Sequence, residues 1–389
     1  MAFGQTLATI DLSALSHNFT QVEKRVGGRK IIAVIKANAY GHGAIAIAKH
    51  LIKSSPPAML AVASLDEAII LREAKIAAPI LLLTGCPADR MGEVVSYRLT
   101  PTLFDTKSLA GDGRLIALSR SLKLASRKVT VHLKVDTGMG RLGIAPSQVV
   151  GFLKKAEDFG IVVEGILSHF AEADLSDLSF AKEQTATIKN VITTLTKKKG
   201  CDPCEGYDPC EMTLPFFHLA NSAAILHFPE AYLDAVRPGL MLYGYSPLEG
   251  KKSFTLRPVM TIRSRVIAIK TVPANTSISY GRTYVTKQTT KVATIGIGYA
   301  DGYPRALSNC GEMIAKGRRV PVIGRVCMDM TMLDVTKVPK LLVGDFVTVI
   351  GQEGKEAVWA DDLAKKAGTI PYEILCGIKG NMPREYVGA

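Results

Sequence analysis

The chain has 389 residues, of which 47% are hydrophobic, and it carries a formal net charge of +13. A chain of this size and composition can form two or three domains with a substantial core, which excludes an intrinsically disordered protein. No apolar stretch reaches the roughly 18 residues of a membrane-spanning helix, and the N-terminal sequence MAFGQTLATIDL lacks the features of a signal peptide, so we expect no membrane association.

Basic residues and cysteines are both scattered along the chain. The densest basic run, Lys197-Lys198-Lys199, is short, and no basic stripe with interleaved aromatic residues occurs, so we expect no nucleic-acid partner. A solvated basic surface explains the charge more simply, although it can also attract small anions. The seven cysteines are an odd number, which favours reduced thiols and a cytoplasmic protein.

Short apolar runs recur through the first 240 residues, each ending in a turn or a polar residue. The first run, IIAVI, ends at Lys36 and is followed by the turn-forming sequence ANAYGHG. Such a run is typical of a strand buried on both faces of a parallel sheet. We predict eight of these strands, over residues 31–36, 59–63, 80–84, 101–104, 129–135, 162–168, 216–219 and 235–237.

Helix-like stretches lie between these runs, for example over residues 64–74, 146–159 and 180–196. The first of them opens with a capping box made by Ser64 and Glu67. Eight repeats of strand and helix predict an α/β fold, a (β/α)₈ TIM-like barrel, over residues 1–247. A doubly wound open sheet is the competing fold, but it usually has a G-x-G-x-x-G turn after its first strand, and KANAYGHG lacks that spacing.

The sequence changes character near residue 247. From residue 257 onward, β-branched runs follow one another closely with Gly and Pro between them, as at 292–297, 320–323 and 343–350. This pattern predicts a second, mostly β domain over residues 248–389, with one late helix near 358–367.

A segment at 201–212 contains Cys201, Cys204 and Cys210. The C-x-x-C spacing can bind zinc or act in redox chemistry, but three cysteines do not complete a zinc finger. His218, the nearest possible fourth ligand, falls in a predicted buried strand. We therefore interpret the segment as a surface loop and expect no metal site.

Polar side chains gather where the predicted barrel strands end. The C-terminal ends of barrel strands all open on one mouth, where barrel enzymes have their active sites. Singly, these residues have structural explanations: an arginine can form a salt bridge, a histidine can be a core residue and a serine can cap a helix. Their shared position is harder to attribute to stability, and it predicts an active site containing Lys36, Lys134, Arg141, His169, Asn221, Ser222 and Arg237.

The usual phosphate site of a barrel follows strands seven and eight. Here that region contains Ser222, at a predicted helix start, and the backbone N–H groups of Gly239 and Leu240. A phosphate held there, with the amine of Lys36 at the first strand, is what a phosphorylated aldehyde needs. Pyridoxal 5'-phosphate fits, because its aldehyde forms a Schiff base with a lysine.

Eight motifs spread over nearly the whole chain are highly specific together. They are AVIKANAYGHG (33–43), LKVDTGMGRLG (133–143), SHFAEAD (168–174), HLANSAA (218–224), VRPGLMLYG (236–244), SYGRTY (279–284), IGYADGYPR (297–305) and GRVCMDM (324–330). On these motifs the chain resembles the alanine racemase family. It departs from the family's pattern in the cysteine-bearing segment and in its tail, which matches only at Pro383-Arg384 and Tyr386.

The resemblance implies a role for each matching residue. Lys36 is then the Schiff-base lysine and Arg237 faces the pyridine nitrogen. Arg141 bonds the phenolic oxygen and is oriented by Lys134, a candidate for carbamylation. Phosphate ligands implied by the resemblance are Tyr40, Ser222, Gly239, Leu240 and Tyr372, with His169 and Asn221 also at the cofactor. Tyr280 resembles a second catalytic base supplied by the partner subunit of a homodimer. The substrate surface implied is Tyr284, Tyr299, Arg305, Met328 and Asp329, together with Arg141.

Racemisation moves a proton between the two faces of a planar carbanion, and one base on each face does this most simply. Lys36 can serve one face and a tyrosinate at Tyr280 the other. Together with this mechanism, the family resemblance implies an isomerase that interconverts L- and D-alanine and supplies D-alanine for peptidoglycan. Alternatives are a racemase of broader specificity, acting on serine or basic amino acids, a decarboxylase of related fold, or a non-catalytic pyridoxal-phosphate carrier. The carriers are single-domain, so residues 257–389 favour the enzyme.

Overall fold

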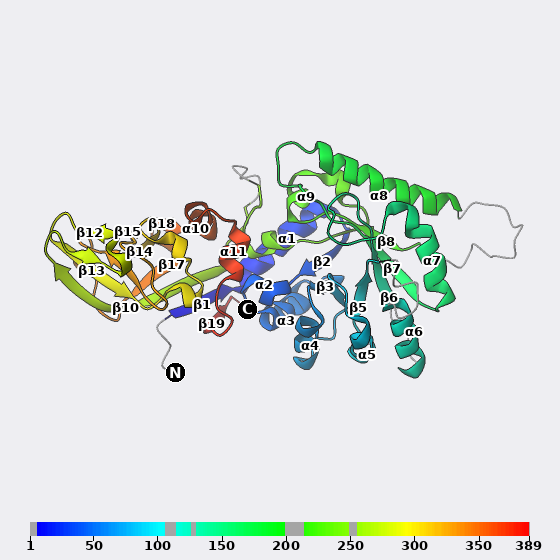
Figure 1. The fold of residues 1–389 in the computed structure, drawn as a ribbon, viewed down its shortest axis with the longest axis horizontal. Coiled ribbons are helices and arrows are strands. Elements are labelled where there is room, and N and C mark those ends of the chain that lie inside the picture. The colour runs from blue at the N-terminus through cyan, green and yellow to red at the C-terminus, as the bar shows by residue number, and fades with distance from the viewer. Residues whose placement is uncertain (1–5, 106–113, 126–129, 199–213, 249–254, 389) are drawn as a thin grey trace, which may run out of the picture.

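The computed structural model describes residues 6–105, 114–125, 130–198, 214–248 and 255–388, and it has two lobes arranged along its long axis (Figure 1). The cysteine-bearing segment at 201–212 lies outside the described residues. None of the helices in the described ranges is both long and apolar enough to cross a membrane.

One lobe is a closed barrel, so the predicted (β/α)₈ fold is confirmed. Within the described residues its strands are all parallel, and each overlaps one of the predicted runs. Strands such as β3 and β4 are buried along their full length, because side chains fill the barrel and helices cover it. The barrel strands are β2 (Lys30–Val34), β3 (Met59–Val62), β4 (Ile80–Leu82), β5 (Thr100–Leu103), β6 (Thr130–Lys134), β7 (Val162–Leu167), β8 (Phe216–His218) and β9 (Ala235–Val236).

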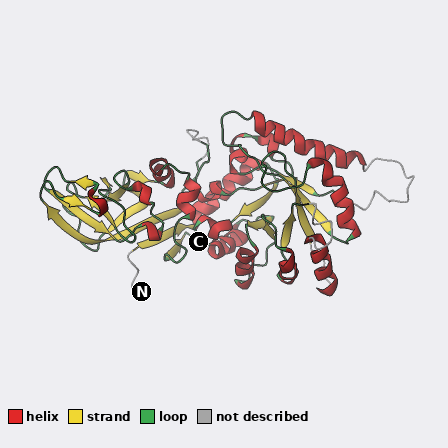
Figure 2. Ribbon diagram, in the orientation of Figure 1, coloured by secondary structure: helices red, strands yellow, loops and turns green. Residues whose placement is uncertain are grey.

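Helices surround the barrel strands (Figure 2). Local sequence sets their ends: Asp11 caps α1 by accepting hydrogen bonds from the N–H groups of Ser13 and Ala14, and the predicted capping box of Ser64 and Glu67 opens α4. The helices of this lobe are α1 (Leu12–Val26), α2 (Lys36–Tyr40), α3 (Ala44–Ser54), α4 (Leu65–Glu73), α5 (Met91–Ser96), α6 (Arg114–Ala125), α7 (Val149–Asp158), α8 (Ser179–Lys198) and α9 (Ser222–His227), with short 3₁₀ turns at Ala88–Arg90, Pro146–Gln148, Pro229–Ala231 and Leu240–Tyr243.

The other lobe is mostly β, as predicted. Its longest strand, β10 (Met260–Val272), pairs antiparallel with β1, β13 and β17. The remaining elements are β11 (Ser277–Ile278), β12 (Tyr284–Val285), β13 (Thr290–Ile295), β14 (Glu312–Ala315), β15 (Arg318–Pro321), β16 (Thr331–Asp334), β17 (Phe346–Glu353), β18 (Glu356–Val358), α10 (Ala360–Ala367), α11 (Pro371–Cys376) and β19 (Arg384–Val387), with 3₁₀ turns at Tyr280–Arg282, Tyr299–Asp301 and Arg305–Leu307.

The first described strand, β1 (Thr6–Asp11), belongs to this β lobe and not to the barrel. It pairs antiparallel with β10, from Thr6 opposite Ser264 to Ile10 opposite Met260, and parallel with β19. Its buried and half-buried residues alternate, as expected for a strand with one face on a core. The predicted division assigned residues 1–247 to the barrel domain; in the structure residues 6–11 pair with strands of the β lobe, and α1 then leads into the barrel.

Asn18 on α1 ties the start of the β lobe to the barrel. Its side chain is fully buried, donates to the carbonyls of Leu242 (3.0 Å) and Arg257 (2.8 Å), and accepts from the Arg257 N–H (2.8 Å). One amide thus satisfies three backbone groups, of which the Leu242 carbonyl is buried.

Replacing Asn18 with leucine should therefore lower the free energy of unfolding by about 1–3 kcal/mol, because the buried Leu242 carbonyl and the part-buried backbone groups of Arg257 lose their partner. The midpoint of urea unfolding measures this effect. Asn190→Leu, on an exposed position of α8, is the control and should change stability by less than about 0.5 kcal/mol. Equal effects of the two substitutions would contradict the role given to Asn18.

Candidate active site

The chain after the first barrel strand forms a left-handed helical turn. Ala37, Asn38, Ala39 and Tyr40 have φ angles of 53°, 53°, 55° and 52°. This conformation costs L-residues about 1–2 kcal/mol each, and of these four residues only Asn38 is of a type that adopts it readily. We predicted a turn here but not its handedness, because alanine has no preference for positive φ. Lys36 therefore lies where the strand has ended and immediately before the strained turn begins.

Neighbouring side chains hold this turn in place. The Glu67 carboxylate accepts from the Ala37 N–H (2.5 Å), and Asn38 Oδ1 accepts from the Ala44 N–H (2.9 Å) at the start of α3. The fully buried His42 donates from Nδ1 to the carbonyls of Ala39 and Tyr40, each at 2.9 Å. Glu67, which forms the capping box of α4 with Ser64, thus also fixes the backbone next to Lys36. The sequence pattern did not indicate this second role.

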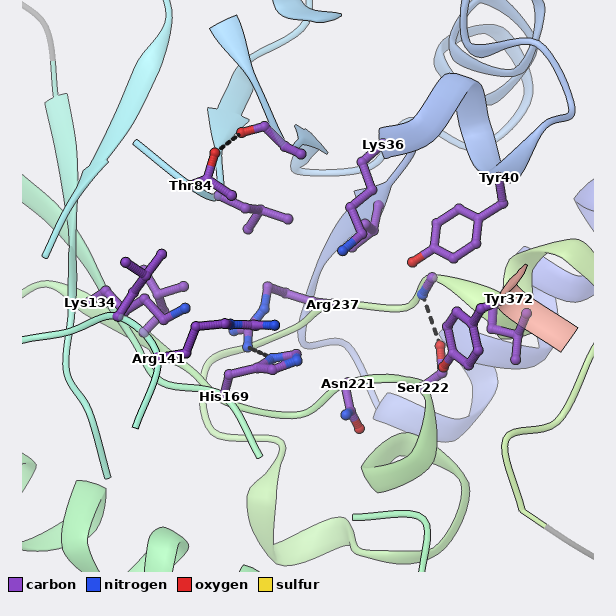
Figure 3. A pocket seen from close by; sticks show the side chains of 17 residues that line it. Lys36, Tyr40, Thr84, Lys134, Arg141, His169, Asn221, Ser222, Arg237 and Tyr372 are labelled. Carbon is purple, nitrogen blue, oxygen red and sulfur yellow. Dashed lines mark hydrogen bonds between the residues drawn. The ribbon is translucent and has the colours of Figure 1, made fainter. Parts of the chain in front are cut away.

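A cavity of about 290 Å³ lies where the barrel strands end (Figure 3). The residues that we predicted to contact the cofactor all line it, and so does Lys134. Tyr372 reaches it from α11 of the β lobe, with its ring 5.9 Å from that of Tyr40. The lining residues are Val34, Lys36, Tyr40, Ala63, Leu83, Thr84, Lys134, Arg141, Leu142, Leu167, His169, Asn221, Ser222, Arg237, Gly239, Leu240 and Tyr372.

Arg237 lines the cavity, and its side chain is buried and bonded only to neutral acceptors in the described part of the chain. One terminal nitrogen donates to His218 Nδ1 (2.7 Å) and the His218 carbonyl (2.8 Å). The other donates to the carbonyls of Ser168 (2.6 Å) and Leu219 (3.1 Å) and lies 3.4 Å from His169 Nδ1. The Nε–H has no acceptor among the described residues and is the donor left for a ligand. Burial lowers the Arg237 pKa to about 10, so the guanidinium stays charged at neutral pH.

One end of the cavity is rich in hydroxyl and amide donors. Ser222 Oγ accepts from the N–H groups of Gly239 (2.9 Å) and Met241 (3.4 Å), which leaves the hydroxyl proton free to donate. Burial raises the Tyr372 pKa to about 12 and the Tyr40 pKa further, so both phenols remain donors. A Cβ on residue 239 would lie 2.5 Å from Tyr40 Oη, so only glycine fits beside this tyrosine. An anion with several acceptor oxygens suits this end.

The charged residues that line the cavity are all basic: Lys36, Lys134, Arg141 and Arg237. Burial, and then the nearby Arg141, lower the Lys36 pKa, which raises the fraction of neutral amine available as a nucleophile and base near neutral pH. Burial followed by Arg237 and Arg141 lowers the Lys134 pKa to about 8. Burial and Arg237 keep the His169 pKa well below its usual value, so this ring is neutral. The cavity therefore favours anionic ligands.

The other predicted site residues lie elsewhere, in the β lobe. Tyr280 follows β11, which pairs with β12, and β12 lies at the end of that lobe far from the barrel (Figure 1). The Tyr280 side chain is 70% exposed. Ser279 Oγ donates to the Arg325 carbonyl (2.6 Å), and the Tyr299 N–H donates to the Cys327 carbonyl (3.0 Å), so neighbouring loops are joined here. None of Tyr280, Tyr284, Tyr299, Arg305, Met328 and Asp329 lines the barrel cavity. Within one chain, the predicted site is thus in two parts.

Known proteins with the same architecture identify the family. The family model for the alanine racemase N-terminal domain matches residues 10–247, and that for the C-terminal domain matches residues 259–386. The alanine racemase of Halothermothrix orenii is 44% identical over 384 residues, covering 98% of this chain and 96% of that protein. The chain belongs to the alanine racemase family. The resemblance drawn from the eight motifs is therefore confirmed, and the alternative of a single-domain carrier is set aside.

Solved structures of family members match almost the whole chain. The alanine racemase of Bacillus anthracis with bound L-Ala-P is 35% identical and has a TM-score of 0.86, covering 100% of this chain and 97% of that one. The alanine racemase of Bartonella henselae with covalently bound pyridoxal phosphate is 29% identical, with a TM-score of 0.84, and the match covers 99% of this chain and 100% of that one.

Several residues of this alanine racemase family site were missed from the sequence. Thr84 ends the third predicted strand run, so the rule that selected Lys36 also pointed to it. His218, the partner of Arg237, had been considered only as a possible metal ligand. Within the described residues no cluster of three or more His, Cys, Asp or Glu side chains can hold a metal ion.

The left-handed turn predicts that Ala→Gly substitutions will have a different effect on stability in this turn than in a right-handed helix. Ala37→Gly should leave stability unchanged or raise it by up to about 1 kcal/mol, because glycine adopts positive φ without strain. The same change at Ala186, exposed in the right-handed helix α8, should cost about 1 kcal/mol. Urea unfolding of both variants checks the contrast. If Ala37→Gly cost as much as Ala186→Gly, the turn would not be left-handed in solution.

Proposed function

We propose that this protein is a pyridoxal-phosphate-dependent racemase that interconverts L-alanine and D-alanine. The observation that carries the proposal is the barrel cavity, which combines a buried lysine amine with a donor-rich end and contains only basic charged residues. Membership of the alanine racemase family supports the same reaction.

The cavity fits the cofactor's phosphate. The Ser222 hydroxyl, the Leu240 N–H and the phenols of Tyr40 and Tyr372 would hold it, since all are neutral donors in one region of the cavity. The Gly239 backbone would lie beside the phosphate, with its N–H orienting Ser222 Oγ. The close approach between residue 239 and Tyr40 explains why glycine is needed there. Borohydride reduction of the purified protein, followed by peptide mapping, should place the cofactor on Lys36, and an adduct on another lysine would refute this assignment.

Pyridoxal phosphate, when bound, supplies an aldehyde that condenses with amines and a ring that withdraws electrons from the α-carbon. Arg237 would donate its Nε–H to the ring nitrogen, because its other N–H groups are already bonded to the protein. A guanidinium does not give up its proton, so Arg237 would keep that nitrogen unprotonated. Arg237 thereby limits electron withdrawal and disfavours transamination.

Two bases would move the α-proton. Lys36 Nζ serves one face of the substrate, and its lowered pKa suits it to accept a proton at neutral pH. Tyr280 Oη serves the other face. His169 Nδ1 lies 3.4 Å from an Arg237 nitrogen that can only donate, so the neutral ring would carry its proton on Nε2, where it can donate to the phenolate of Tyr280.

Tyr280 can act only if a second copy of the chain brings it to the cavity. Its place after β11 in the β lobe and its exposure support a homodimer in which each active site combines the barrel of one protomer with the β lobe of its partner. The partner's loops would also bring the predicted substrate surface, which comprises Tyr284, Tyr299, Arg305, Met328 and Asp329.

Lys134 is proposed to carry a carbamate. Its pKa of about 8 leaves a reactive fraction of neutral amine at neutral pH, which adds CO₂ and releases one proton. The product is an anion among Lys36, Arg141 and Arg237, where it would relieve repulsion between like charges and orient Arg141. Carbon-13 NMR after exposure to labelled bicarbonate, with Lys134→Met as the blank, tests this step.

In the cell we propose that the enzyme is cytoplasmic and supplies D-alanine for peptidoglycan. We also propose a domain boundary close to residue 247, with residues 6–11 assigned to the β domain because β1 pairs with β10 and β19.

Incubation of the protein with individual L-amino acids and pyridoxal phosphate, followed by chiral chromatography, tests the proposed reaction. Racemic alanine is the expected product. Serine or basic amino acids turned over as fast as alanine would replace the proposal with a racemase of broad specificity, and no racemisation of any substrate would refute it.

The two bases should have separable effects on exchange of the α-hydrogen with solvent. Losing a general base typically slows a reaction by about 10²–10⁴-fold. In Tyr280→Phe, net racemisation should fall by that factor in both directions, because each direction uses both bases. Exchange into heavy water needs one base only, so D-alanine should still exchange through Lys36 while exchange from L-alanine collapses. Proton NMR of both enantiomers measures this, and equal loss for the two would contradict the assignment.

A further inference from the structure

Two histidines form a buried chain behind Arg237. His132 on β6 and His218 on β8 are both fully buried, and His132 Nδ1 lies 2.9 Å from His218 Nε2. Strand β7 runs between their strands, and its Gly165 pairs with His132. A Cβ on residue 165 would lie 2.7 Å from the His132 ring, so the two imidazoles meet only because the middle strand has glycine there.

Arg237 determines where the protons of this chain lie. A guanidinium can only donate, so His218 Nδ1, 2.7 Å from Arg237, must accept. A neutral imidazole that accepts at Nδ1 has its proton on Nε2, and this proton points to His132. His132 Nδ1 must then accept, which leaves its own proton on Nε2. The contacts between the three side chains allow no other arrangement of neutral rings.

Both rings stay neutral because of their surroundings. Burial, followed by the charges of Arg237 and Lys30, lowers the His132 pKa to about 3. Burial, followed by Arg237 and His132, holds the His218 pKa well below its usual value. If either ring were protonated, two N–H donors would face each other. The hydrogen bonds from Arg237 to His218 and from His218 to His132 therefore keep the same direction at all pH values near neutral.

A purely structural role explains this arrangement poorly. His132 Nε2 is buried and has no hydrogen-bond partner in the described residues, so the chain ends in an unsatisfied donor. The Phe216 ring packs edge-on against His132, with ring centroids 5.1 Å apart, and a purely apolar side chain would suit that neighbour better. The hydrogen bond that His132 does make is directed toward Arg237 through His218.

We propose that His132 is a positioning residue: by accepting from His218 Nε2–H it fixes the His218 tautomer that holds the Arg237 guanidinium toward the active-site cavity. The proposal rests on the proposed function for its effect on rate, but not for the proton arrangement itself. Without His132, the His218 proton can move to Nδ1 and face the Arg237 donor. The guanidinium would then turn away, and its contact with the cofactor ring would be weakened.

Nitrogen-15 NMR of the histidine-labelled protein tests the proton arrangement directly, without substrate. Both His132 and His218 should show a protonated Nε2 and an unprotonated Nδ1. In His132→Asn, the amide oxygen replaces the lost Nδ1 acceptor and the His218 pattern should persist. In His132→Leu that acceptor is gone, and His218 should show a mixed or reversed pattern. A protonated Nδ1 on His218 in the unmodified protein would overturn the proposal, whatever reaction the enzyme catalyses.

Kinetics tests the consequence for Arg237. His132→Leu should lower kcat about tenfold with KM changed less than about twofold, since the substrate's own contacts are untouched, and should shift the absorbance band of the bound cofactor. His132→Asn should recover most of both properties. His50→Leu is the matched control. His50 lies on α3 and also has a side-chain partner, Ser16 Oγ at 2.7 Å, but it makes no hydrogen bond to His132, His218 or Arg237. Equal losses of kcat in His132→Leu and His132→Asn, or no spectral change in either, would contradict the positioning role.

Discussion

The structure depends on a buried guanidinium that has no carboxylate partner among the described residues. Arg237 is charged in the interior of the barrel, where an isolated charge is costly. It is stabilised by carbonyl oxygens from the ends of β7 and β8 and by the lone pairs of His169 and His218. These acceptors lie in the right places only because parallel strands end together at one mouth. The barrel therefore holds a cation that can donate to a ligand without protonating it.

Much of this arrangement follows from simple patterns in the sequence. Apolar runs followed by polar residues locate all of the barrel strands, since strands buried on both faces have no polar alternation. The rule that barrel sites lie at C-terminal strand ends selects Lys36, His169 and Arg237 from residue position alone, while Tyr40 and Tyr372 enter only through resemblance to the family. Their placement around the cavity agrees with that selection, and their chemical roles stay proposals.

Other features depend on long-range contacts that no local pattern encodes. Ala37 and Ala39 adopt a left-handed conformation against their own preference, because contacts from Glu67 and His42 outweigh the strain. Strand β1 pairs with segments about 250 and 375 residues further along the chain, as between Ala8 and its partners Ile262 and Arg384, so its lobe could not be derived from its own sequence. The buried chain of His132 and His218 likewise needs the glycine on the intervening strand.

The division of the candidate site between two lobes leads to the central claim, that each active site is shared by two protomers. Mixing Lys36→Ala with Tyr280→Phe under conditions of subunit exchange tests it most directly. Neither variant alone should racemise alanine at an appreciable rate. In an equal mixture about half of the dimers contain both variants, and one site in each is intact, so activity should approach about a quarter of that of the unmodified enzyme. Proven exchange with no recovery of activity would contradict shared sites.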